Sequence, residues 1–353
     1  MGESTPRPLR APRRCGGAGR GRAGHRQARG ARIPPGLSPG IAKPLVLLLA
    51  LAIDLAFGDP SNRYHPVAWI GRLLAAGGRR LCRGSPAALL AGGVAVTVGV
   101  AAVAGGAGAA VSALAERLGV AGVLLEALAL TCLLAFRGLV GAARAVAADL
   151  DRGDLAAARR AVGYHLVSRP TAELGERQVV SATVESVAEN LTDSLVAPVF
   201  FFLVGGLAWA AVYRVINTAD SMFGYRRGPL EYFGKSAARL DDLVNVIPAR
   251  IAGLSLVVGA ALTGESARGA LATLRRERRC TESPNAGWTI AAMAGALGVV
   301  LEKPSVHTLG TGAAPIVGDI ERSVRVLRAA SGVSLLLLLA AFVLARALLG
   351  LSA

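Results

Sequence analysis

The chain has 353 residues, of which 53% are hydrophobic and 18% are charged, and its formal net charge is +16. This apolar composition is unusual for a soluble domain and predicts an integral membrane protein whose main partner is the lipid bilayer. The positive charge does not indicate nucleic-acid binding, because no folded basic domain with interleaved aromatic residues accompanies it.

The first 43 residues form a basic tail rich in Gly, Arg, Pro and Ala. They contain nine Arg, one Lys and one acid, Glu3, so the tail carries +9 of the net charge and the remainder carries +7. We expect residues 1–43 to be disordered, because they lack the apolar side chains needed for a core. The basic stretch before LVLLLALAI also suits a signal peptide, but no small-residue cleavage pattern follows it, which favours an uncleaved membrane segment.

Residues 44–353 are predicted to form a single all-α membrane domain, a polytopic helical bundle with about five transmembrane helices. A helix needs about 20 apolar residues to cross the hydrocarbon core. Five runs approach or exceed this length: 86–115, 118–136, 194–213, 244–263 and 329–345. Shorter apolar runs at 44–57 and 283–301 are expected to be partly inserted or buried.

Amphipathic or basic segments lie between these runs, at residues 137–180, 264–282 and 321–328. Their apolar residues recur at helical spacing, and Lys and Arg concentrate on the cytoplasmic side of membrane spans. We therefore expect amphipathic cytoplasmic helices. No β-rich segment is evident.

The run 194–213 contains the pair Gly205-Gly206 at its centre. If this run crossed the membrane completely, the polar residues of 217–242 would face the opposite side from those of 137–193. Two half-helices that fold back at the glycine pair would return both polar segments to one side, and irregular backbone at depth is tolerated inside protein. We therefore favour a re-entrant hairpin near Gly205-Gly206.

Three carboxylates, Glu185, Glu189 and Asp193, recur at spacing i, i+4, i+8, which places them on one face of a helix with Asn190 beside them. The ordinary explanation is a solvated helix face in a cytoplasmic loop. The functional explanation is a site for a divalent cation or an amine, because carboxylate oxygens suit Mg²⁺ that bridges to phosphate.

A second polar set follows the apolar run. Tyr213, Asn217 and Asp220 share one helix face at i, i+4, i+7, and Asp241 and Asn245 are again four residues apart, with Asp242 adjacent. Arg250 lies inside an apolar run and needs an anion, which is either Asp241 or Asp242 in a structural salt bridge or a substrate phosphate or carboxylate.

Shorter motifs supply further candidate substrate-binding residues. The segment FGDPSNRYHPVAWIGR contains Arg63 and His65, HLVSRPTAEL contains Arg169, the loop after FGY contains Arg226, and SPNAGW brings Ser283 and Asn285 to a helix start. Backbone N–H groups at such a start suit a phosphate. Each of these signals is weak by itself, and His65 is as readily a packed side chain.

Taken in order, the motifs resemble the CobD/CbiB family of cobalamin biosynthesis, the adenosylcobinamide-phosphate synthases. The resemblance covers residues 45 to 350 and rests on GDP-SNRYHPV-WIGR, LVSR-TAEL, ATVESVAENLTDSLVAPVFFFL, YRVINTADSMFGY, YFGKSAARLDDLVNVIPAR and SPNAGWTIAAMAGALGV. The chain departs from the family pattern at Pro170 and Ser194, and the basic tail lies outside it.

The resemblance implies a multi-pass protein of the inner (cytoplasmic) membrane with a cytoplasmic active site. The implied reaction is ATP-dependent: an amide bond joins the f-side propionate of adenosylcobyric acid to (R)-1-aminopropan-2-yl phosphate or a related amino alcohol. ATP is then a co-substrate, Mg²⁺ a cofactor, and other cobalamin-pathway enzymes are candidate partners.

For this reaction we assign roles as follows. The expected catalytic residues are Glu185, Glu189, Asp193, Asp220, Asp241 and Asp242, of which Glu189, Asp193 and Asp220 are the expected metal ligands. The expected substrate-binding residues are Arg63, His65, Arg169, Asn190, Asn217, Arg226, Arg250, Ser283 and Asn285. Arginine suits phosphate and propionate because its guanidinium forms paired hydrogen bonds.

Two other classes of function remain open from the sequence. An ion-coupled membrane transporter also uses broken helices and buried carboxylates, although we find no inverted repeat. A non-catalytic scaffold for corrinoid enzymes is the second alternative. Turnover of ATP together with amide product separates the synthase from both.

Overall fold

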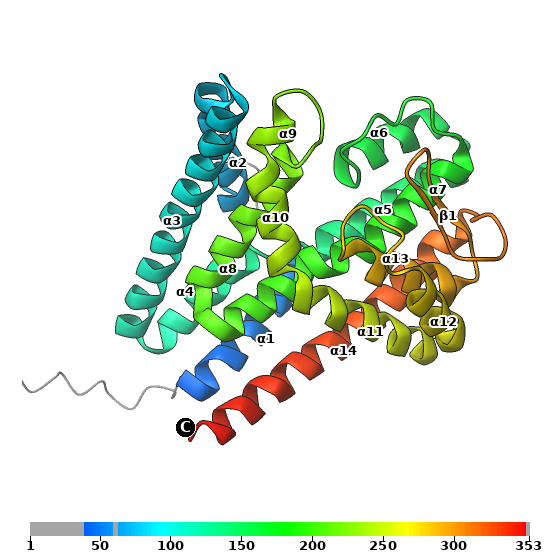
Figure 1. The fold of residues 1–353 in the computed structure, drawn as a ribbon. Coiled ribbons are helices and arrows are strands. Elements are labelled where there is room, and N and C mark those ends of the chain that lie inside the picture. Colours follow the sequence, from blue (N-terminus) through cyan, green and yellow to red (C-terminus); the bar gives the residue numbers. More distant parts are fainter. Residues whose placement is uncertain (1–38, 59–62, 351–353) are drawn as a thin grey trace, which may run out of the picture. The chain divides into compact units, whose positions relative to one another are not determined.

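Helices account for nearly all of the regular structure in the computed structural model, which describes residues 39–58 and 63–350 (Figure 1). Most of the expected disordered tail lies outside these residues, whereas residues 39–43 belong to the first helix. The predicted all-α class is confirmed. The helices are α1 (Pro39–Phe57), α2 (Pro66–Leu81), α3 (Pro86–Leu118), α4 (Val120–Thr131), α5 (Phe136–Asp151), α6 (Leu155–His165), α7 (Glu176–Leu191), the π-turn η1 (Thr192–Val196), α8 (Ala197–Phe223), α9 (Leu230–Phe233), α10 (Lys235–Val244), α11 (Val246–Leu262), α12 (Ala267–Glu277), α13 (Ala286–Leu297) and α14 (Gly318–Leu348).

Local sequence explains where several helices begin. Ser85 caps α3 by accepting from the Ala88 N–H, and Pro86 follows at the first helical position, where no N–H partner is needed. Asp154 caps α6 and Ser266 caps α12 in the same way. A single capping residue therefore marks where each of these three helices begins.

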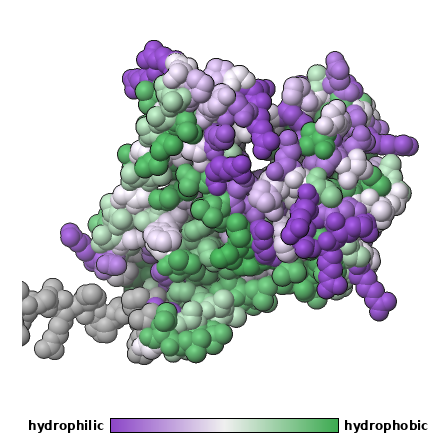
Figure 2. Space-filling model, viewed as in Figure 1, coloured by the Kyte–Doolittle hydropathy of each residue, from purple (hydrophilic) through white to green (hydrophobic). Residues whose placement is uncertain are grey.

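Four helical stretches are long and apolar enough to span a bilayer: Pro86–Leu118, Val120–Asp151, Glu176–Phe223 and Gly318–Leu348. The pair α10–α11 adds a fifth if its two helices, bent by 53°, count as one broken span. The prediction of about five spans is confirmed within this range. Only 28% of the apolar window in α3 and 33% of that in α14 is buried, so the remaining apolar surface needs lipid. Figure 2 shows hydrophobic side chains gathered over α3, α8 and α14, and hydrophilic side chains around α6, α9 and α12.

The chain folds back on itself inside α8, at Gly206. This residue has φ 71° and ψ −165°, a backbone region that only glycine occupies readily. A straight helix would place Asp193 about 30 Å from Tyr213. Instead the Tyr213 hydroxyl lies 3.1 Å from the Asp193 carboxylate, and the rings of Phe201 and Tyr213 stack with centroids 5.2 Å apart. The predicted break at the glycine pair is confirmed (Figure 1).

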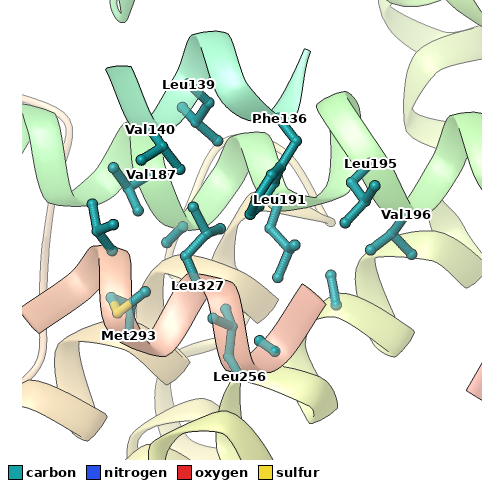
Figure 3. Packing of buried hydrophobic residues seen from close by; sticks show 14 of the residues in the cluster. Phe136, Leu139, Val140, Val187, Leu191, Leu195, Val196, Leu256, Met293 and Leu327 are labelled. Atoms are coloured by element: carbon teal, nitrogen blue, oxygen red, sulfur yellow. The ribbon is translucent and has the colours of Figure 1, made fainter. Parts of the chain in front are cut away.

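A core of buried apolar side chains packs the helices around this fold-back. Side chains from α5, α7, η1, α11, α13 and α14 interdigitate there (Figure 3). Its members include Phe136, Leu191, Leu256, Met293 and Leu327, all nearly or fully buried. The α7–η1 segment lies in the centre of this core, which fixes the position of the polar side chains that it carries.

One small element was not expected from the sequence. Strands β1 (Leu301–Lys303) and β2 (His307–Leu309) form an antiparallel hairpin in which Lys303 lies opposite His307. Strands of three residues are too short to give a readable alternation of apolar and polar residues. The hairpin is held by Ser181 of α7, whose hydroxyl accepts from the Glu302 N–H at 2.7 Å and lies 3.2 Å from the Glu302 carbonyl.

We expect Gly206→Ala to lower the free energy of unfolding by about 1–3 kcal/mol, because an L-residue is strained at this φ and ψ. Thermal unfolding of the detergent-solubilised protein measures the effect. The matched control is Gly99→Ala in α3, where an added Cβ meets nothing within 4 Å and alanine favours the helix. Equal stability of the two variants would contradict the role given to Gly206.

Candidate functional site

Side chains from η1, α8 and α10 converge beside the fold-back. The Tyr213 hydroxyl lies 3.1 Å from both Asp193 Oδ1 and Asn245 Oδ1, so its single proton is shared between two acceptors. Asn245 donates through Nδ2 to Asp241 Oδ2 at 3.0 Å, and Asn217 Nδ2 lies 3.4 Å from Asp241 Oδ1. We call Asp193, Tyr213, Asn217, Asp241 and Asn245 the acidic network.

Asp193 lies in the π-turn η1, which adds one residue to the helical turn after α7. Glu189 interacts electrostatically with both Glu185 and Asp193, which agrees with the predicted proximity of the three carboxylates. Asp193 points to Tyr213, and its backbone carbonyl accepts from Arg214 at 3.2 Å.

Two more carboxylates border the acidic network. Asp220 and Glu189 each interact electrostatically with Asp193, and Asp220 also interacts with Asp242. Within the described residues, neither Asp220 nor Glu189 has an ion-pair or hydrogen-bond partner for its side chain. Asp220 lies against Gly224, where an added Cβ would come within 2.1 Å of its Oδ1. The nearby cations are Arg214, which interacts with Asp193, and Lys303, which interacts with Glu189. The carboxylates outnumber them, which makes this region attractive to a positively charged ligand.

Asp242, the neighbour of Asp241, belongs to a second set of contacts. Its carboxylate accepts from the Ser283 hydroxyl at 3.1 Å, and its backbone carbonyl accepts from Asn285 Nδ2 at 2.7 Å. Asn285 Oδ1 in turn accepts from the Arg250 guanidinium at 2.5 Å. Two consecutive residues of α10 thus connect the acidic network to the loop that precedes α13.

The two explanations left open for Arg250 are now distinguishable. Its guanidinium bonds to Asn285 and stacks on Trp288, 4.9 Å from the ring centroid. It forms no ion pair with Asp241, Asp242 or any other carboxylate of the part of the chain that the structure describes. A structural salt bridge therefore does not account for its position, which leaves most of its donors available to an anion.

Comparison with known proteins identifies the family of this chain. Residues 47–336 match the model of the family described as CobD/Cbib protein, which is most of the chain. The chain belongs to the CobD/CbiB family.

The matches to individual relatives also cover most of the length of each relative. The chain is 42% identical over 274 residues to "Cobalamin biosynthesis protein CobD" of Geobacter metallireducens, a match that covers 78% of this chain and 86% of the relative. It is 40% identical over 265 residues to "Probable cobalamin biosynthesis protein CobD" of Methanothermobacter thermautotrophicus, with 75% and 86% covered. It is 39% identical over 286 residues to the CobD of Klebsiella pneumoniae, with 80% and 89% covered. No solved structure matches the chain.

The candidate site contains carboxylates suited to Mg²⁺, but its described side chains do not form a complete set of metal ligands. Among the described residues, no group of three His, Cys, Asp or Glu side chains lies close enough to hold a metal ion. Mg²⁺ commonly binds through one or two carboxylates, with water and substrate phosphate as the other ligands. Glu189, Asp193 and Asp220 fit that arrangement, because two of them lack a protein partner and all three interact electrostatically. Their role as metal ligands stays a prediction.

Glu185, which interacts electrostatically with Glu189, contacts the β-hairpin. Its carboxylate is 3.6 Å from His307 Nε2 of the β-hairpin, and both side chains are nearly buried. Ser181 donates to its other oxygen at 3.2 Å. We did not identify His307 from the sequence. The signal available for it was the polar cluster EKPSVH in an otherwise apolar region.

The remaining predicted substrate-binding residues do not join the acidic network directly. Asn190 bonds within its own helix, to the Ser186 carbonyl at 2.9 Å. His65 caps α2 by accepting from the Val67 N–H at Nδ1, and Arg63 stacks on Tyr64 at 5.4 Å. Arg169 lines a surface pocket with Arg160 and Tyr164, and Arg226 is exposed after α8.

The end of α1 is linked by hydrogen bonds to the π-turn that carries Asp193. Asp54, near the end of α1, accepts from the Arg137 N–H at 3.1 Å, and the Ala135 N–H donates to the Ser194 carbonyl at 3.2 Å. The end of α1, the start of α5 and the π-turn are thereby joined.

We expect Tyr213→Phe to destabilise the protein by about 1–3 kcal/mol, because it leaves the Asp193 and Asn245 oxygens without their shared donor. Chemical or thermal unfolding in detergent measures the change. Tyr225→Phe is the control, since that hydroxyl makes one exposed bond to the Ser221 carbonyl. A Tyr213→Phe variant as stable as the control would show that this network contributes little.

Proposed function

We propose that this protein is the adenosylcobinamide-phosphate synthase of cobalamin biosynthesis. It joins the f-side propionate of adenosylcobyric acid to the amine of (R)-1-aminopropan-2-yl phosphate or a related amino alcohol, at the expense of ATP. Membership of the CobD/CbiB family supports the pathway. The observation that carries the reaction is the juxtaposition of an acidic network with an arginine that has no carboxylate partner, linked through Asp241 and Asp242.

Amide formation poses a defined chemical problem. A carboxylate is a poor acyl donor, because the oxygen that must leave is a poor leaving group. Transfer of a phosphoryl or adenylyl group from ATP to that oxygen supplies a good leaving group. The amine then attacks the carbonyl carbon, the new C–N bond replaces the C–O bond, and the nitrogen loses two protons from its ammonium form.

The residues of the acidic network suit the amine side of this reaction. Asp193 and Asp241 attract and orient the ammonium, and a carboxylate of this set accepts its proton before attack. Asn217 and Asn245 hold Asp241 in place through its two oxygens, so its orientation is set before substrate arrives. Mg²⁺, when bound at Glu189, Asp193 and Asp220, would neutralise phosphate charge.

The arginines suit the anionic groups. Arg250 offers a planar set of donors beside the loop that holds Ser283 and Asn285, and Arg169 offers another in its surface pocket. Guanidinium groups bind phosphate and carboxylate through paired hydrogen bonds. We place the site on the cytoplasmic side of the inner membrane, where ATP is available, in keeping with the basic segments between the spans.

The direct experiment uses membranes or purified full-length protein incubated with ATP, Mg²⁺, a cobyric acid and the amino-alcohol phosphate. We expect amide product, formed in proportion to ATP consumed and detected by mass spectrometry. Movement of corrinoid across sealed vesicles without ATP turnover would instead support a transporter. Absence of both activities, in protein that binds corrinoid, would support a scaffold.

We expect Asp220→Asn to lower kcat/KM for amide formation by at least about 100-fold, because a charged group that positions the reacting atoms is lost. The variant should insert and fold normally, since no described partner depends on the Asp220 charge. Asp151→Asn at the exposed end of α5 is the control and should keep full activity. Near-normal turnover of the Asp220 variant would remove this residue from the site.

A further inference from the structure

Two arginines of the chain share one aromatic ring. Arg250 of α11 and Arg278, directly after α12, both stack on Trp288 of α13, with guanidinium carbons 4.9 and 5.4 Å from the ring centroid. Their charges interact with each other electrostatically. Two like charges held this close repel, and the indole ring compensates only part of that repulsion.

The two guanidinium groups have few other partners. Arg250 donates to Asn285 at 2.5 Å, and Arg278 donates to the Arg275 carbonyl at 3.0 Å. Neither forms an ion pair with a carboxylate among residues 39–58 and 63–350. An arginine carries five N–H donors, so most of the donors of this pair are free for a ligand.

The surroundings add further donors for an anion. Asn285 is the residue before α13, so the first N–H groups of that 12-residue helix lie beside the stacked pair. The hydroxyls of the same short loop already donate to protein acceptors, Thr281 to the Ser283 carbonyl at 2.7 Å and Ser283 to the Asp242 carboxylate at 3.1 Å, so the helix N–H groups are the added donors. Asp242 is the carboxylate that takes part in these contacts. It accepts from the Ser283 hydroxyl and forms no ion pair with an arginine of the described residues.

The position of this pair relative to the acidic network points to the ligand. Asp241 contributes to the acidic network, and Asp242, the next residue, contributes to the loop that holds Arg250. The acidic network and the loop beside the arginine pair are therefore bonded to neighbouring residues of α10. A small molecule with an ammonium and a phosphate a few bonds apart matches that arrangement.

We propose that Arg250 and Arg278, stacked on Trp288, bind the phosphate of a short amino-alcohol phosphomonoester and leave its amine toward the acidic network. This inference rests on the proposed function and assigns one substrate of it to named residues. A phosphomonoester carries about −1.5 to −2 charges at neutral pH, which suits two guanidinium groups. A propionate carries a single charge and needs only one of them, so the corrinoid carboxylate is the poorer match.

Binding of O-phosphoethanolamine to purified full-length protein, without ATP, tests the assignment. Isothermal titration calorimetry gives the dissociation constant. We expect Arg278→Gln to raise it about 10- to 100-fold, the effect of losing charge-assisted hydrogen bonds to a phosphate. Arg250→Gln should act in the same direction. The matched control is Arg279→Gln, an exposed neighbour with the same loss of charge, which should bind as the wild type does.

Each outcome bears on one proposal. Wild-type affinity in both the Arg278 and Arg250 variants, or no binding of O-phosphoethanolamine by the wild type, overturns the inference and leaves the synthase assay to decide the function. Binding that is lost in Arg278→Gln and kept in Arg279→Gln supports the site even if no amide product forms. In that case the phosphate site stands and the proposed synthase reaction fails.

Discussion

The backbone reversal at Gly206 is the constraint on which the site depends. Without it, the polar residues before and after the apolar run would lie at opposite ends of a long helix. With it, Asp193 of η1 meets Tyr213 of α8, and α10 can then add Asp241 and Asn245 to the same place. The reversal needs a residue without a side chain, because its φ and ψ fall where other residues are strained. A single backbone position thus organises the polar groups of three helices.

The polar groups near the bilayer differ in how fully they are compensated. Tyr213, Asn217 and Asn245 satisfy one another and the two aspartates between them. Asp220 and Glu189 have no such partners within the described residues, and neither Arg250 nor Arg278 has a carboxylate. Groups of the first kind hold the structure together. Groups of the second kind keep hydrogen-bonding capacity that the described residues do not use, and a ligand of opposite charge can use it.

Sequence reasoning predicted the architecture well, because it depends on features that a linear pattern records. Apolar runs, basic segments and a glycine pair were enough to place the spans and the reversal at Gly206. Spacing at i, i+4 also brought Tyr213 and Asn217 onto one face, and Asp241 and Asn245 onto another.

What the sequence could not predict depends on contacts between distant segments. His307 reaches Glu185 from a hairpin with three-residue strands, and Arg278 meets Arg250 only because both stack on Trp288. The π-turn that contains Asp193 is likewise not predicted by a helical pattern. For the outlying candidates, such as Arg63 and Arg226, the structure describes a position and leaves the role a prediction.

The adjacency of Asp241 and Asp242 has a consequence for communication between the two proposed subsites. Asp241 belongs to the acidic network, and the Asp242 carbonyl is bonded to Asn285, which in turn accepts from Arg250. A displacement of α10 on binding of the amine would therefore be transmitted to the loop that carries the phosphate-binding arginine.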